Sequence, residues 1–282
     1  MKTTKKWMGK LASLMMALVL ICTLLPVQAE AMVRNDVPVI CAALDSAGEV
    51  VDGMPGIPSI NAIQCSPDSF GMINSFDYGQ LDKFYAEIGV QFELMKAEGA
   101  EAIVVFMHWG EEYQLEPTDY QKKIAQKLCD MGVDVIVGGH PHVIEPVDLL
   151  TSTQDENQNT LIIYSTGNAV SNQRIREMRM KTGHTEDGIL FNFTLVKYID
   201  GTVEVREASC VPTWVHMVGD KESYTILPLE FDLREQWQET FGIDEDTYTA
   251  CVNSFTRTMD LVGEGLEKAQ AWYDALFEAK YA

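Results

Sequence analysis

Basic residues and histidine are scarce in this sequence. Its 282 residues include 21 Lys and Arg against 42 Asp and Glu, which gives a formal net charge of −21 at pH 7. Such an acidic surface repels phosphates, so the composition argues against nucleic-acid binding, and it equally repels other anionic polymers unless a cation lies between them. The chain has five histidines, and none of them precedes His108. A site built on histidine must therefore be assembled from residue 108 onward.

Closely spaced cysteines are absent, and so are long apolar runs after the first 25 residues. Residues 32–282 contain five cysteines, an odd number, and no two of them lie closer than 24 residues apart. This spacing excludes a disulfide framework and a Cys-x-x-Cys metal site. No later segment of the sequence is long and apolar enough to cross a bilayer as a helix.

The start of the chain has the pattern of a secretory signal peptide. Four lysines precede an apolar run at residues 11–25, and small residues at 27–31 offer cleavage sites. We expect residues 1–31 to be a signal peptide, because the run is shorter than the ~20 residues that a membrane span needs. The mature protein is then secreted or extracytoplasmic, or it stays associated with the membrane through an uncleaved signal segment.

The centre of the chain predicts a strand, a helix and a second strand. The apolar runs 102–107 and 133–137 have no polar face, as strands covered on both sides of a parallel sheet require. Between them, Thr118 and Gln121 have the spacing of a capping box at a helix start. A right-handed crossover places the carboxyl ends of both strands at one sheet edge, where open α/β sheets build their sites.

Periodicity predicts the other elements of an α/β fold. Asp200-Gly201, between two alternating segments, is a strong hairpin signal. The segment 171–187 is basic and polar, and we expect it to be a flexible or binding loop. The remaining expected elements are a strand at 37–44, a long loop at 45–76, a helix at 79–98, strands at 161–164, 188–198, 202–209 and 213–218, and helices from 226 onward.

Three histidines follow the two central strands. His108 ends the first strand, and His140 and His142 flank Pro141 after the second. Pro141 favours an extended His140, and residues two apart in an extended chain point the same way, so we expect both imidazoles to face one point. Gly138 and the next glycine would let the backbone turn close to it. Such a cluster suits Mn, Fe or Zn; the alternative is that the histidines only hydrogen-bond loop backbone.

Three further side chains near this edge are weaker candidates. Glu111 and Glu112 would position a metal ligand or act as a general acid, or they are simply solvated. Asn168 follows the strand at 161–164, where it would orient a histidine or a substrate, or only make a turn. His184 and His216 have no such partners in the sequence, and we expect structural roles for both.

At these residues the sequence resembles the CapA family, bacterial proteins of poly-γ-glutamate capsule synthesis. The resemblance covers about residues 80–260. It implies a calcineurin-like metallophosphoesterase fold, here a partial α/β/β/α sandwich with mixed sheets and a C-terminal helical segment. The matching stretches are His108-Trp109-Gly110-Glu111-Glu112-Tyr113, Pro117-Thr118 with Gln121, Gly139-His140-Pro141-His142-Val143, Tyr164-Ser165-Thr166-Gly167-Asn168, Pro212-Thr213-Trp214-Val215 and Ser254-Phe255-Thr256-Arg257-Thr258.

The resemblance also implies a site and a role. His108 and His140 would bind one divalent metal, and His142 would bind a second. The protein would act in the biosynthesis of a capsule or cell-envelope polymer, with that polymer or its biosynthetic machinery as partner. The expected organisation is the signal peptide, a CapA-like metallophosphatase domain at 32–225 that corresponds to the family's middle and C-terminal part, and an acidic helical extension at 226–282.

One departure from the family leaves two hypotheses open. The family takes further Asp, Asn and His ligands from an N-terminal half that has no counterpart here, where Asp45 is the one upstream carboxylate placed like a ligand. A phosphoesterase site clamps its substrate between two ions ~3.5–4 Å apart, which three histidines alone do not readily hold. The chain is then a hydrolase whose missing ligands come from another chain or from unrecognised residues, or a non-catalytic extracellular binding protein or truncated gene product.

Overall fold

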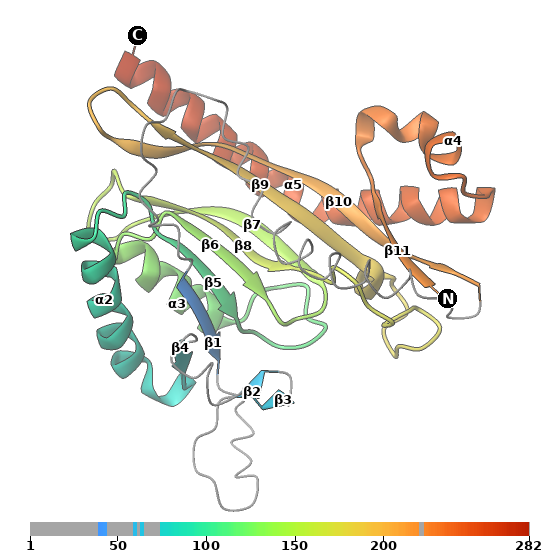
Figure 1. Cartoon of the computed structure of the whole chain (residues 1–282), viewed down its shortest axis with the longest axis horizontal. Helices are drawn as coiled ribbons and strands as arrows, with labels where there is room; N and C mark the ends of the chain where they lie inside the picture. Colours follow the sequence, from blue (N-terminus) through green and yellow to red (C-terminus); the bar gives the residue numbers. More distant parts are fainter. Residues whose placement is uncertain (1–38, 44–58, 61–62, 65–73, 220–222, 282) are drawn as a thin grey trace, which may run out of the picture.

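A computed structural model of the chain describes residues 39–43, 59–60, 63–64, 74–219 and 223–281 (Figure 1). The predicted signal peptide, Asp45 and most of the predicted loop at 45–76 lie outside the described residues. The strands are β1 (Val39–Ala43), β2 (Ser59–Ile60), β3 (Ile63–Gln64), β4 (Asn74–Phe76), β5 (Val104–His108), β6 (Val135–Gly139), β7 (Ile144–Thr151), β8 (Asn159–Thr166), β9 (Asp187–Lys197), β10 (Val203–Val218) and β11 (Ser223–Pro228). The α-helices are α2 (Leu81–Ala97), α3 (Asp119–Asp130), α4 (Trp237–Phe241) and α5 (Glu245–Tyr281).

A six-stranded mixed sheet forms the centre of the fold, with the strand order β4-β1-β5-β6-β8-β7. All neighbours in this sheet pair in parallel except β7, which runs antiparallel to β8. The predicted strand–helix–strand unit is confirmed as β5–α3–β6. Two strands of this sheet were not predicted: β4 falls inside the expected loop at 45–76, and β7 falls where no element was assigned. Outside this sheet, β2 and β3 in the same loop and β11 after residue 218 were not predicted either.

Helices α2 and α3 cover one face of this sheet (Figure 1). Leu81, Phe84, Ile88 and Phe92 recur at helical spacing on α2 and are buried, as predicted for 79–98. Helix α3 begins with the expected capping box, in which the Thr118 hydroxyl accepts from the backbone N–H of Gln121. The helical spacing of Tyr120, Ile124 and Leu128 predicts the apolar side of α3, and this prediction is wrong for Tyr120. Tyr120 is 50% exposed, and the buried residues of this helix include Ile124, Ala125 and Leu128.

The second layer consists of the β9–β10–β11 sheet and helix α5, which cover the other face (Figure 1). Strands β9 and β10 pair antiparallel around Gly201, as predicted, and the strand expected at 213–218 is the continuation of β10. Helix α5 lies so close to β7 that a Cβ on Gly265 would come within 1.8 Å of the Val147 carbonyl oxygen. Val262, Ala269 and Tyr273 on α5 are buried in a common core with β7, β8 and β9.

Within this layer, a buried ion pair joins helix α5 to the start of β9. Asp187 is 1% exposed, and its carboxylate accepts hydrogen bonds from the Arg257 guanidinium at 2.9 and 2.7 Å and from the Ser254 hydroxyl at 2.7 Å. The motif at 254–258 therefore places two donors one helical turn apart on α5, both facing one carboxylate. No helix within the described ranges is long and apolar enough to cross a membrane.

Candidate functional site

The parallel sheet brings the predicted histidines to one edge. His108 is the last residue of β5 and pairs in register with Gly139, the last residue of β6, and His140 follows directly. The ring centroids of His108 and His140 lie 4.6 Å apart, and those of His140 and His142 lie 6.2 Å apart. The carboxyl ends of β5 and β6 point to the same edge in Figure 1, as the crossover argument predicts.

The backbone of this turn differs from the expected extended conformation. His140 has φ of +107° and His142 has φ of +58°, so the argument that residues two apart share a direction does not apply. Tyr113 has φ of +66°, and its N–H donates to the Pro141 carbonyl at 2.7 Å. Among the described residues, these three are the non-glycine residues with positive φ. Each such residue costs about 1–3 kcal/mol, and such strain concentrates at functional sites.

The two glycines before this turn have different surroundings. A Cβ on Gly138 would lie 1.9 Å from the Tyr164 carbonyl oxygen and 2.6 Å from the Trp109 indole nitrogen. The Trp109 indole N–H donates to that same carbonyl at 2.9 Å. Gly138 therefore makes room for a buried tryptophan, whereas a Cβ on Gly139 would meet nothing within 4 Å.

Asn168 holds the ring of His142. Its side-chain NH₂ faces the carbonyl oxygens of His142 and Thr185, each at 3.0 Å, so its Oδ1 is the atom that lies 2.9 Å from His142 Nδ1. An amide oxygen only accepts, so His142 Nδ1 carries a proton, and in the neutral ring Nε2 is the nitrogen with a lone pair for a metal. Nε2 lies 3.8 Å from a carboxylate oxygen of Glu112. This geometry agrees with the prediction that Asn168 orients a histidine.

Burial sets the protonation of His108. Desolvation, together with the neighbouring His140 and His142, lowers the pKa of His108 to about 4. The imidazole is therefore neutral at neutral pH, which is the form that binds a metal. Two close imidazoles suit Zn²⁺, Mn²⁺ or Fe as part of a ligand set, but they do not complete a coordination shell. Within the described ranges, no group of three or more His, Cys, Asp or Glu side chains is placed to hold a metal ion.

The other predicted residues divide into two groups. Glu111 and Glu112 are exposed on the loop after His108, and only Glu112 approaches one of the three histidines in a described contact. His184 and His216 lie elsewhere: His184 Nδ1 is 4.0 Å from Asp187 Oδ2, and the ring of His216 packs at 5.7 Å from that of Trp214. Neither joins the other three histidines.

Two residues near His142 were missed as site residues. The ring of Tyr113 stacks on that of His142 at 6.1 Å. Gln173 joins the two sides of the turn: its NH₂ donates to the Tyr113 hydroxyl at 3.1 Å, and its carbonyl oxygen accepts from Asn168 at 3.0 Å. Tyr113 ends a motif that was recognised, whereas no local sequence signal marks Gln173.

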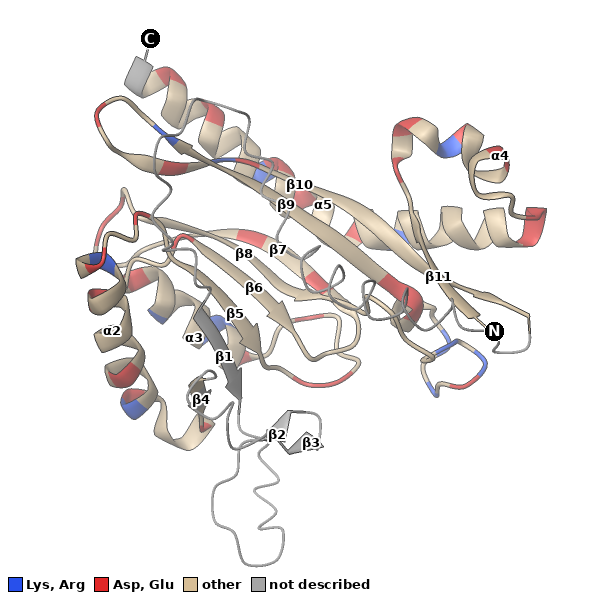
Figure 2. Ribbon diagram, in the orientation of Figure 1, with Lys and Arg blue, Asp and Glu red and all other residues tan. Residues whose placement is uncertain are grey.

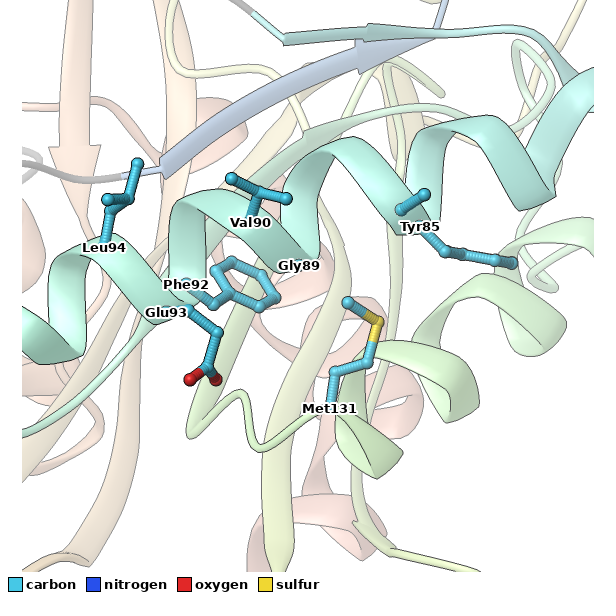
Figure 3. Close-up of a pocket in the computed structure, with 8 residues that line it drawn as sticks. Tyr85, Gly89, Val90, Phe92, Glu93, Leu94 and Met131 are labelled. Atoms are coloured by element: carbon cyan, nitrogen blue, oxygen red, sulfur yellow. The ribbon is translucent and has the colours of Figure 1, made fainter.

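A pocket is lined by helix α2 and by Met131 at the end of α3, and none of the three histidines lines it (Figure 3). Its lining is mostly apolar and includes Phe92, Val90 and Met131. Helix α2 precedes the amino end of β5, and Met131 precedes the amino end of β6. The histidines instead lie at the carboxyl ends of these two strands. The pocket is therefore not part of the histidine site.

The chain has relatives among capsule proteins. Residues 61–173 match the family model described as Bacterial capsule synthesis protein PGA_cap. The chain is 38% identical over 153 residues to the PGA biosynthesis protein CapA of Bacillus subtilis (strain 168). The aligned region covers 51% of this chain and 37% of that protein. It is 36% identical over 95 residues to the Capsule biosynthesis protein CapA of Bacillus anthracis. This aligned region covers 33% of this chain and 21% of that protein.

The chain thus spans well under half of the length of these curated relatives. The segment matched by the family model contains His108, His140, His142, Asn168 and Gln173. These matches confirm the resemblance that the motifs indicate: residues 61–173 are similar to bacterial capsule synthesis proteins, two of which are named CapA.

Proposed function

We propose that this chain acts in the biosynthesis of a capsule or other cell-envelope polymer, poly-γ-glutamate in the first instance, as a metal-dependent protein of the phosphoesterase type. The observation that carries the proposal is the approach of His108 and His140 to 4.6 Å between ring centroids, next to a turn with strained backbone. Strain of this kind persists only where the surrounding structure holds it in place, and it is common at ligand sites.

His108 and His140 would hold a first divalent metal, Mn, Fe or Zn. His142 would offer Nε2 to a second, because Asn168 fixes the proton on Nδ1. A metal in such a site polarises a phosphoryl oxygen and lowers the pKa of bound water. Glu112, whose carboxylate lies 3.8 Å from His142 Nε2, would position that histidine or act as a general acid. Further ligands would come from residues outside the described ranges or from another chain.

The proposed location is outside the cytoplasm, in agreement with the signal-peptide pattern at residues 1–31. The proposed partner is the polymer or its biosynthetic machinery. The names of the two Bacillus relatives, which refer to PGA biosynthesis and to capsule biosynthesis, support this assignment.

The second candidate function is a non-catalytic polymer-binding protein of the envelope. One observation favours it: the described residues contain no group of three or more ligand side chains that is placed to hold a metal. Under this alternative the histidine turn is retained for its structure, and the protein binds its partner without hydrolysis.

Hydrolysis of bis-p-nitrophenyl phosphate in the presence of Mn²⁺ separates the two functions. The phosphoesterase proposal expects turnover by the wild-type protein, loss of turnover in His140→Ala, and no change in His216→Ala, a histidine outside the site. Equal rates in the wild-type protein and His140→Ala would favour the binding protein.

A further inference from the structure

The loop between β8 and β9 contains a concentration of positive charge in an otherwise acidic chain. Residues 171–183, which we name the basic loop, contain four basic residues and one acidic residue. The whole chain has twice as many acidic as basic residues. Figure 2 shows blue stretches along this loop, whereas most of the coloured stretches elsewhere are red.

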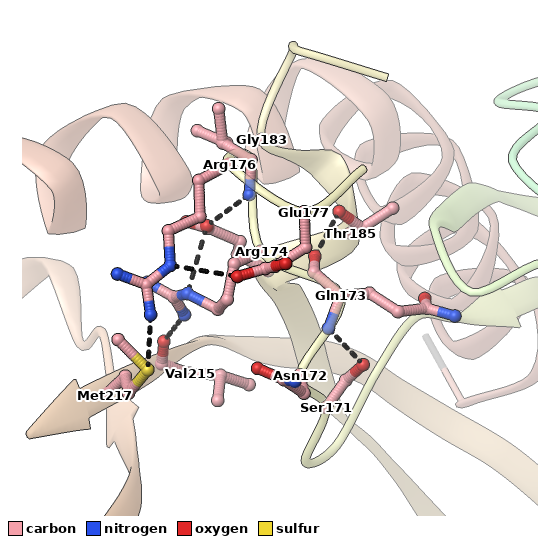
Figure 4. A network of polar contacts seen from close by, with 12 residues as sticks. Ser171, Asn172, Gln173, Arg174, Arg176, Glu177, Gly183, Thr185, Val215 and Met217 are labelled. Carbon is pink, nitrogen blue, oxygen red and sulfur yellow. Dashed lines mark hydrogen bonds and ion pairs between the residues drawn. The ribbon is translucent and has the colours of Figure 1, made fainter. Parts of the chain in front are cut away.

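One of the four cations fixes the loop to the protein. Arg174 Nε lies 3.2 Å from a carboxylate oxygen of Glu186, and its guanidinium lies over the Trp214 ring at 4.9 Å. The same guanidinium donates to the Val215 carbonyl (Figure 4). Arg174 is therefore a structural residue that pairs with the Glu186 carboxylate and does not face an external ligand.

The other three cations are exposed: Arg176, Arg179 and Lys181. Arg176 Nε lies 3.3 Å from the Glu177 carboxylate on the surface, and Lys181 Nζ donates to the Ile175 carbonyl at 2.6 Å. A guanidinium has five N–H donors and an ammonium has three, so these contacts leave donors for an external anion. Because surface ion pairs contribute little to stability, an external anion can replace Glu177 at Arg176 at a small cost in free energy.

The basic loop is attached directly to the histidine site. Gln173, within the loop, accepts a hydrogen bond from Asn168 and donates one to the hydroxyl of Tyr113. Asn168 and Tyr113 in turn contact His142. An anionic chain that lies on the exposed cations would therefore continue towards the histidine edge.

We infer that the basic loop binds a carboxylate-bearing polymer and presents it to the edge formed by His108 and His140. The polymer class rests on the proposed function, but binding by the loop needs no metal and no turnover. Guanidinium groups bind carboxylates in a planar, two-pronged geometry. The acidic remainder of the protein repels poly-γ-glutamate as it repels a nucleic acid, so the attraction must come locally from the three exposed cations of the basic loop.

Fluorescence anisotropy with labelled poly-γ-glutamate, at low salt and with EDTA present, tests the inference. The variant Arg176→Gln/Arg179→Gln/Lys181→Gln removes the three exposed charges and keeps polar side chains. The matched control, Lys83→Gln/Lys123→Gln/Lys127→Gln, removes three exposed charges from α2 and α3. Thermal melts of both variants confirm that they fold.

We expect the loop variant to bind the polymer roughly tenfold more weakly than the wild-type protein, and the control to stay within about twofold. Equal weakening in both variants, or no binding by the wild-type protein, would overturn the inference. Tighter binding of single-stranded DNA than of poly-γ-glutamate would overturn the polymer class. Loop-dependent binding together with no phosphoesterase turnover would defeat the hydrolase proposal alone, because EDTA makes the binding assay independent of metal.

Discussion

Replacing Arg257 by methionine should destabilise the protein strongly and in a pH-dependent way. The substitution removes the guanidinium that donates two hydrogen bonds to Asp187, a carboxylate that is 1% exposed. Breaking a buried pair by removing one partner costs about 3–5 kcal/mol. Because the Arg257 side chain is 21% exposed and Ser254 still donates to Asp187, we expect a loss of about 3 kcal/mol in the free energy of unfolding.

The pH dependence of this loss follows from the Asp187 carboxylate. Burial raises the pKa of Asp187 above its ordinary value of 3.8, and Arg257 opposes that rise. Without Arg257 the pKa of Asp187 in the folded protein rises further. Between about pH 3.8 and this raised pKa, the folded variant keeps a proton that the unfolded chain has already released. Stability then falls as pH increases through this window. The deficit relative to wild type is therefore larger at about pH 8 than at about pH 5.

Urea denaturation followed by tryptophan fluorescence measures both effects. Arg234→Met, which removes an exposed arginine, is the control and should change stability by no more than about 0.5 kcal/mol. The double variant Asp187→Asn/Arg257→Met should recover part of the loss, because no buried charge remains. A deficit of less than about 1 kcal/mol, or one that does not change with pH, would refute the reasoning.

Three other substitutions test the packing and the electrostatics. Gly138→Ala should cost at least about 3 kcal/mol in urea denaturation, because the new Cβ overlaps the Tyr164 carbonyl. Gly265→Ala should cost a similar ~3 kcal/mol, because its Cβ overlaps the Val147 carbonyl, and should lower the melting temperature. Glu145 is buried and its pKa is raised to about 7, so Glu145→Gln should gain stability relative to wild type, on the order of 2 kcal/mol, as pH rises from about 5 to 7. If the difference in free energy of unfolding between Glu145→Gln and the wild-type protein does not change between about pH 5 and 7, the expectation for Glu145 is contradicted.

The parts of the fold that could be predicted are those that local sequence determines. The unit β5–α3–β6 has continuous apolar strands and a capping box, and each signal lies within a few residues of the element that it defines. Strand β7 was missed because Glu145 and Pro146 interrupt its apolar pattern. The Glu145 side chain is buried and accepts from Gln121, a partner 24 residues away that the sequence does not reveal. Strand β4 depends in the same way on pairing with β1.

The candidate site was predictable in residue type but not in conformation. The convergence of His108 and His140 follows from the crossover rule, and the rings do approach each other. The extended conformation expected for His140 was wrong, because a local preference before proline gives way to the tertiary contact between Tyr113 and the Pro141 carbonyl. Gln173 escaped notice since its contacts with Asn168 and Tyr113 form only in the folded chain.

The metal content of the folded protein tests the central proposal most directly. Wild-type protein, His108→Ala and His216→Ala are loaded with Mn²⁺ or Zn²⁺, passed through a desalting column and analysed by elemental mass spectrometry. The proposal predicts that the wild-type protein and His216→Ala retain metal and that His108→Ala does not. Asn168→Ala should bind metal roughly 10- to 100-fold more weakly than wild type. Equal retention by the wild-type protein and His108→Ala, or retention by neither, would contradict a metal site at the ends of β5 and β6.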